Sequence, residues 1–187
     1  MTATPLGDDV VGLGRRALHT LRHTLERDLG DQAAITLQEA GYAAGDETYV
    51  AFSRWLADYA GVSDPAELDA DTLSDVLGAF FRSLGWGNLR VERLGAAALA
   101  VDSSDWAEAE PDTRASAPSC HISAGLLASL FGRIADQDVA VMEIECRTRN
   151  DPRCRFLAGA QDTLQEVYAA MSEGKDYREV LGVRGAP

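Results

Sequence analysis

Apolar residues recur every three or four positions through the first third of the chain, which is the spacing of amphipathic helices. A first helix is expected over residues 9–29, with Gly30 as its stop. Its apolar stripe consists of Val10, Val11, Ala17, Leu18, Leu21 and Leu25. The same spacing predicts two further helices, over residues 32–39 and 47–59.

A fourth helix is expected to begin at Thr72, which has the spacing of a capping box with Asp75. Beyond this helix the apolar period shortens to two, which is typical of half-buried strands. This change predicts one strand around Leu89 and Val91 and a second strand over residues 96–101.

Residues 103–118 are rich in Ser, Asp, Glu, Ala and Pro, so we expect an exposed connection that Trp106 alone could fix to the core. The last third is expected to hold a helix, a two-stranded hairpin and a final helix, over residues 121–135, 139–148, 153–157 and 163–171. This order of elements predicts an α+β fold in which an antiparallel sheet of about four strands packs against helices. We expect residues 1–187 to form one domain that ends in a short tail from about residue 175.

Composition and charge narrow the classes of partner. A chain of 187 residues with 46% hydrophobic positions can bury the core of one globular domain. Its formal net charge is −13, which repels nucleic acid and anionic membrane surfaces. Asp8 and Asp9 stand where a signal peptide would need cations, and no apolar run has the ~20 residues that a membrane-spanning helix needs. We therefore expect a cytoplasmic protein.

Three patterns carry less information than their spelling suggests. Residues 12–17 match the GxGxxA form of a dinucleotide loop, but the strand that must precede such a loop is missing. His19 and His23 have metal-ligand spacing on one helix, and a solvated helix flank explains them better. Cys120 and His121 are adjacent on a helix, so they do not face each other as a nucleophile and its base.

The three cysteines are the most informative residues. Cys146 and Cys154 are equally far from the middle of the predicted hairpin turn, so they should face each other on neighbouring strands. Cys120 stands at the start of a predicted helix, where free N–H groups and the helix dipole favour a thiolate. A tetrahedral zinc site would then need a fourth ligand, which Glu143 or Glu145 could supply. The alternatives are buried structural thiols, or a disulfide between the two hairpin cysteines.

Such a zinc site would be negatively charged, because three thiolates and a carboxylate outweigh one divalent ion. Four arginines flank the hairpin cysteines in this acidic chain, namely Arg147, Arg149, Arg153 and Arg155. We expect these cations to offset the charge of the site.

The same residues carry a resemblance to a known family. The segments CHISAG at 120–125, MEIEC at 142–146 and DPRCRF at 151–156 resemble the signature of the 4-vinyl reductase domain family, and GYAAG at 41–45 is similar to the family's pattern. That family includes ligand-sensing domains of phenol- and xylene-responsive transcriptional activators and a protein implicated in bacteriochlorophyll vinyl reduction. Its fold resembles subunits of transport-particle (TRAPP) tethering complexes.

The resemblance implies one structural zinc ion, held by Cys120, Glu143, Cys146 and Cys154. Simple alternation would place Glu143 and Cys146 on opposite faces of a strand, so a bulge or a strand end is implied. Glu145 and His121 remain the substitutes for the fourth ligand. A closed site of four protein ligands has no position for a substrate, so the zinc would be structural.

The resemblance also implies an apolar cavity between sheet and helices that holds a small aromatic or other hydrophobic ligand. The candidate lining residues are Phe80, Phe81, Trp86, Leu89, Ala124, Leu127 and Val141. The favoured interpretation is a zinc-stabilised binding module, rather than an enzyme, that acts through a partner or as a homodimer. The alternatives are an enzyme or accessory protein of tetrapyrrole vinyl reduction, and a scaffold of TRAPP-like fold.

Overall fold

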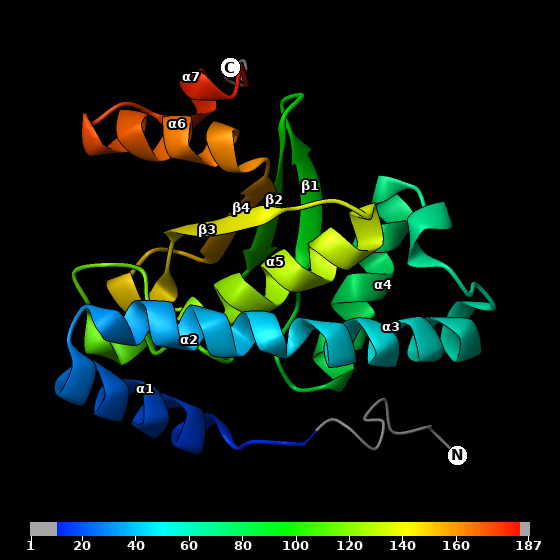
Figure 1. The fold of residues 1–187 in the computed structure, drawn as a ribbon, viewed down its shortest axis with the longest axis horizontal. Coiled ribbons are helices and arrows are strands. Elements are labelled where there is room, and N and C mark those ends of the chain that lie inside the picture. The colour runs from blue at the N-terminus through cyan, green and yellow to red at the C-terminus, as the bar shows by residue number, and fades with distance from the viewer. Residues whose placement is uncertain (1–10, 184–187) are drawn as a thin grey trace.

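A computed structural model describes residues 11–183, so Val10 of the first predicted stripe and the end of the predicted tail lie outside the described residues (Figure 1). One antiparallel sheet forms the centre, in the order β1-β2-β4-β3. Its strands are β1 (Arg90–Leu94), β2 (Ala98–Ser103), β3 (Ala140–Glu145) and β4 (Cys154–Gly159). The predicted α+β class and the four-stranded antiparallel sheet are therefore confirmed.

Helices cover both faces of the sheet (Figure 1). Within residues 11–183 they are α1 (Arg15–Leu29), α2 (Gln32–Ala43), α3 (Gly45–Ala60), α4 (Ala70–Ser83), α5 (His121–Ala135), α6 (Gln161–Ser172) and α7 (Tyr177–Val180). Three short 3-10 turns lie between them, at Pro65–Glu67, Pro111–Thr113 and Arg147–Arg149. Helices α2, α3 and α5 lie on one side of the sheet, and α6 and α7 lie on the other.

Alternation along the strands divides the core into two clusters. Val91, Val101 and Phe156 are cross-strand partners, and they face a large aromatic cluster shared with α3, α4 and α5. Ala100 and Leu157 point the other way, into a smaller cluster under α6 and α7. Any strand residue near the start of α5 must therefore be on the first face.

Close backbone contact fixes α5 against α2 and α3. A Cβ atom built on Gly41 would lie 2.0 Å from the carbonyl oxygen of Ile122, and one on Gly45 would lie 2.2 Å from Ser129 Cβ. A Cβ atom on Gly125 would lie 2.0 Å from the carbonyl oxygen of Gln38. The glycines of the GYAAG segment thus allow α2 and α3 to touch α5, and this contact positions the first turn of α5.

Three predicted boundaries were wrong for local reasons. Helix α4 begins at Ala70, because the carboxylate of Asp69 accepts the N–H groups of Asp71 and Thr72, so Thr72 is not the cap. Helix α2 continues through its predicted stop to Ala43, since Gly41 serves packing there. The strand predicted over 139–148 ends at Glu145, where a 3-10 turn follows.

The connection predicted as exposed is partly core. Trp106 is buried, as the sequence suggested, but Ala107, Glu108 and Ala109 are buried with it. Helix α7 was not predicted, because four residues are too few to show a helical period.

Candidate metal centre and its surroundings

Cys120, Glu143, Cys146 and Cys154 converge at the start of α5. One ligand atom from each of the four residues lies within 4.8 Å of all the others. The Cys120 sulfur lies 3.8 Å from the sulfurs of both Cys146 and Cys154. All three thiols are free and at most 1% exposed, so the structure does not contain the alternative disulfide. The cluster is the one that the resemblance implied.

A β-bulge brings Glu143 and Cys146 to the same face. Glu143 pairs with Phe156, whereas Glu145 pairs with Arg155, so the register shifts between the two glutamates. Because Phe156 faces the large cluster, Glu143 faces it too. Continuing the shifted register by one residue places Cys146 opposite Cys154, the pairing that equal distance from the turn predicted. The predicted bulge is confirmed.

The two substitute ligands lie outside the cluster. Glu145 points to the other face of the sheet, where it accepts a hydrogen bond from Arg153 Nε at 2.9 Å and contacts the Tyr177 hydroxyl. His121 is half-buried and is not among the four clustered residues. Glu143 is therefore the carboxylate that geometry favours.

Glu143 is held by one oxygen and unpaired at the other. The backbone N–H of Cys120 donates to Oε2 at 2.9 Å, while Oε1 is buried without a hydrogen-bond partner. Burial, followed by the negative charge of Cys146, raises the pKa of Glu143 to about 9. Hydrogen bonds from the thiols of Cys120 and then Cys154 hold the pKa of Cys146 well below its usual range, against its burial.

Three sulfurs and one carboxylate oxygen are a donor set that suits zinc in a closed tetrahedral site. The unpaired Glu143 Oε1 is the atom expected of a carboxylate that has lost its cation, since a buried polar atom without a partner is costly. The residues present therefore fit a divalent metal ion.

The hairpin arginines do not serve the site as expected. Three of them pair with carboxylates outside the cluster: Arg149 with Asp151, Arg153 with Glu145, and Arg155 with Asp102. Strand alternation explains this outcome for Arg155, which lies on the face of the sheet opposite to Glu143. Asp151 is the indirect contribution, because its carboxylate accepts the N–H of Cys146 at 2.7 Å.

A buried carboxylate that the sequence analysis missed caps α5. Glu108 accepts the N–H groups of Ile122 at 2.9 Å and Ser123 at 2.8 Å, and also the Ser123 hydroxyl. Trp106 Nε1 donates to the same hydroxyl at 2.7 Å. These N–H groups are therefore occupied by Glu108 and do not stabilise a Cys120 thiolate, as had been expected. Alternation of buried and polar types from Trp106 to Glu110 was the available signal.

Burial raises the pKa of Glu108 to about 7, against the hydrogen bonds from Ser123 and Ile122 and the charge of Arg22. Its side chain is 1% exposed. The carboxyl group is thus poised to change charge near neutral pH within the first turn of the helix that carries Cys120.

The seven predicted cavity residues are brought together, but as packed core. Phe80, Phe81, Leu89, Ala124 and Leu127 are at most 6% exposed, and Trp86 and Val141 pack against the same cluster. Of the pockets described below within residues 11–183, only one is lined by any of the seven, and by Leu89 alone.

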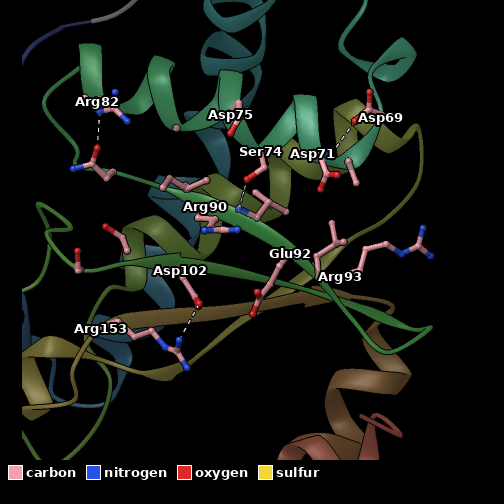
Figure 2. Close-up of a pocket in the computed structure, with 18 residues that line it drawn as sticks. Asp69, Asp71, Ser74, Asp75, Arg82, Arg90, Glu92, Arg93, Asp102 and Arg153 are labelled. Atoms are coloured by element: carbon pink, nitrogen blue, oxygen red, sulfur yellow. Dashed lines mark hydrogen bonds and ion pairs between the residues drawn. The ribbon is translucent and has the colours of Figure 1, made fainter. Parts of the chain in front are cut away.

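The largest hollow is a charged groove of about 1000 Å³ between α4 and the β1–β2 end of the sheet (Figure 2). Figure 2 shows Asp71, Ser74 and Asp75 on the helix above the groove and Arg90 and Glu92 on the strand below it. Acidic and basic side chains alternate around it, so it is not the apolar cavity that was expected.

An apolar pocket of about 430 Å³ lies at the other end of α5 from the cysteines. Its walls come from the last turns of α5, the β1–β2 turn and the ends of β3 and β4, and small residues make up much of them. The lining residues are Leu73, Arg93, Ala96, Ala97, Ala98, Leu99, Phe131, Ile134, Ala135, Gln137, Asp138, Val139, Ala158, Gly159 and Ala160. This volume is within the range of small-molecule sites.

Residues 106–160 match the family model of the 4-vinyl reductase domain. Similar folds include the phenol-responsive sensory domain of the transcription activator PoxR, solved with phenol, with a TM-score of 0.64 and 16% identity over 85% of this chain and 82% of that one. A vinyl-4-reductase family protein from Methanocaldococcus jannaschii has a TM-score of 0.52 and 14% identity over 80% of this chain and 83% of its own.

A trafficking protein particle complex subunit 3 from Naegleria fowleri, covalently bound to palmitic acid, has a TM-score of 0.59 and 17% identity over 78% of this chain and 91% of its own. No curated protein sequence matches the chain. Among the helices described here, none has the length and apolar character that crossing a bilayer requires. The resemblance to the 4-vinyl reductase domain family, and with it the fold shared with TRAPP subunits, is confirmed.

Proposed function

Because the chain carries a 4-vinyl reductase domain, we propose that residues 1–187 form one zinc-stabilised sensory module that binds a small apolar molecule and is not itself an enzyme. The observation that carries the metal half of this proposal is the buried cluster of three thiols and Glu143, whose Oε1 has no partner. The apolar pocket at the far end of α5 supports the ligand half.

The zinc ion would be held by Cys120, Glu143, Cys146 and Cys154. It would supply positive charge to a site where a buried carboxylate and a thiolate now compete for protons. The protein residues do the rest: Cys120 lies at the start of α5, and the other three ligands lie on or beside β3 and β4. Zinc binding would therefore fix the hairpin to the helix.

The apolar pocket suits a small hydrophobic ligand. The PoxR domain of similar fold was solved with phenol, which is a molecule of that class. Phe131 lines the pocket and belongs to the same core cluster as Phe80, Phe81 and Leu127. We propose that the ligand enters beside Phe131, with the seven predicted core residues forming the wall behind it. Polar atoms at the pocket come from Arg93, among others, so the site is not wholly apolar.

Toluene and phenol are suitable probes, because they have the same ring and differ only in a methyl or a hydroxyl group. Ala135→Leu fills the pocket from an exposed position, and Ala57→Leu makes the same change on exposed α3 away from it. Native mass spectrometry and thermal shift should detect binding to the natural chain and to Ala57→Leu, with at least a tenfold weaker affinity in Ala135→Leu. Equal binding by both variants, or no binding by any, would reject this site.

We also propose that the module forms a homodimer. Leu21 and Leu29 on α1 and Ile35 on α2 are each more than 40% exposed, which is unusual for such large apolar side chains on neighbouring helices. Sedimentation equilibrium should give twice the chain mass for the natural protein and one chain mass for Leu21→Glu. A natural protein that sediments as a monomer would refute the dimer.

A further inference from the structure

Arg22 of α1 is buried beside the candidate metal centre. It is 2% exposed, and Leu18 is the other buried residue of this helix. Its Nη1 donates to the carbonyl oxygen of Glu108 at 3.0 Å and to Ser119 Oγ at 3.2 Å, and its Nη2 pairs with Glu110 at 2.8 Å. Burying a guanidinium is costly unless such partners compensate it. These contacts therefore place a full positive charge inside the protein for a reason.

Ser119 connects this arginine to a metal ligand. Its hydroxyl oxygen lies 3.8 Å from Cys146 Sγ, within the range of a hydrogen bond to sulfur. A guanidinium has donors and no acceptor, so the Ser119 oxygen must accept the bond from Arg22. The hydroxyl proton is then free to point to the sulfur. This direction of donation favours Cys146 as the acceptor, which is the form in which a cysteine binds a metal.

Arg22 also fills the role that the hairpin arginines leave open. Two cationic side chains within residues 11–183 are buried, Arg22 and Arg155. Arg155 is committed to Asp102, Glu92 and Tyr177 on the other face of the sheet. Arg22 is the one whose hydrogen bonds lead to the cluster of thiols, where a bound zinc would leave net negative charge.

We propose that Arg22 is a positioning residue of the metal centre: acting through Ser119, it orients Cys146 for the metal and couples the docking of α1 to metal binding. This inference rests on the metal half of the proposed function. The other polar contacts of α1 reach backbone carbonyls away from the cluster, from Arg15 to Gly85 and from His19 to Ala107. Since coupling is reciprocal, metal binding must hold α1 as strongly as docked α1 favours the metal.

Zinc affinity of the full chain, measured by competition with a chromophoric chelator, tests the positioning role. Ser119→Ala removes one hydroxyl group, and Arg22→Gln removes the charge. We expect each to weaken zinc binding by 10- to 100-fold, the usual effect of losing a partner of a metal ligand. The double variant should bind zinc little worse than the more severe of the two single variants, because both act on one path. Arg15→Gln, on the same helix, should bind zinc normally.

Hydrogen exchange of α1 with and without a chelator tests the coupling. In the natural chain, amide protection over Arg15–Leu29 should fall when zinc is removed. In Ser119→Ala, α1 protection should respond much less to zinc. A merely structural Arg22 would lower the melting temperature while leaving zinc affinity and the zinc response of α1 unchanged.

The outcomes separate the two proposals. Unchanged zinc affinity in both Ser119→Ala and Arg22→Gln overturns this inference and leaves the zinc site standing. A natural chain that binds no zinc overturns both. If Arg22→Gln fails to fold, Ser119→Ala alone decides, because it deletes a single oxygen atom from a buried serine.

Discussion

The backbone N–H of Cys120 donates to Glu143 Oε2 across 2.9 Å, and this bond joins the first residue before α5 to the bulged strand β3. It orients the carboxylate so that one oxygen is satisfied by protein and the other, Oε1, is left without a protein partner. A hydrogen bond of this kind positions a ligand before the metal arrives, which lowers the cost of assembling the site.

Glu143→Gln should weaken zinc binding by at least tenfold while the natural strand pairing is kept. The amide is nearly the same size, but it is neutral and a poor ligand for zinc. Glu145→Gln is the matched control, since Glu145 is two residues away and points to Arg153 on the other face. Chelator competition should show normal zinc affinity for the control. A Glu145→Gln variant that loses zinc as Glu143→Gln does would show that the bulge has been assigned incorrectly.

The site could be predicted from sequence as far as local spacing carries it. Cys146 and Cys154 were paired correctly because a hairpin turn fixes register over a few residues. The choice of Glu143 over Glu145 needed the family resemblance, since alternation without the bulge places both glutamates on the face opposite to Cys146. The layer around the ligands could not be predicted, because Arg22 and Glu108 reach it across the fold from distant segments.

Glu108 should make stability fall as pH rises toward neutrality. Its pKa is about 7 in the folded protein against an ordinary value of 4.5, so the native state binds its proton more tightly than the unfolded state. The stabilisation is complete below about pH 4.5 and is lost as pH rises to about 7, a change of up to about 3 kcal/mol. Urea unfolding of the natural chain and of Glu108→Gln between about pH 5 and 8 measures it by difference.

The difference between the free energies of unfolding of the natural chain and Glu108→Gln should shrink as pH rises through this window. Groups common to both chains, including the metal ligands, cancel in that difference. A difference that stays constant with pH would mean that Glu108 titrates at its ordinary value, despite its burial.

Gly41→Ala should destabilise the protein by about 2 kcal/mol or more. The new methyl group would meet the backbone carbonyl of Ile122, which cannot move without shifting α5 from α2. Gly12→Ala is the control, because a Cβ atom there meets nothing within 4 Å. Its change in unfolding free energy should stay within about 0.5 kcal/mol. Equal and small effects in the two variants would contradict the close contact of α2 and α5.

Arg155→Ala should cost about 3 kcal/mol or more. The guanidinium is 5% exposed and bonds Asp102, Glu92 and Tyr177 together, so its loss leaves buried acceptors unpaired and frees α7. Arg27→Ala breaks an exposed pair with Asp28 and should cost less than about 1 kcal/mol. Chemical unfolding of both variants checks the contrast, and similar small losses would refute it.

The fold itself was largely predictable. The range expected for α5, 121–135, matches the observed helix, because its apolar residues recur every four positions and cover the core face. Errors arose where tertiary contact overrode local signals. Gly41 reads as a stop in isolation, yet it lies inside α2 because Ile122 approaches it there. The segment around Glu108 reads as an exposed loop, yet it is buried because it caps α5.

Metal content, measured together with thiol reactivity, tests the central claim most directly. Elemental analysis of the full chain should find about one zinc ion per chain. Cys146→Ser and Cys154→Ser should each lose the zinc and melt at a substantially lower temperature, because metal binding is coupled to folding. A stable, zinc-free protein whose three thiols titrate freely would contradict the account.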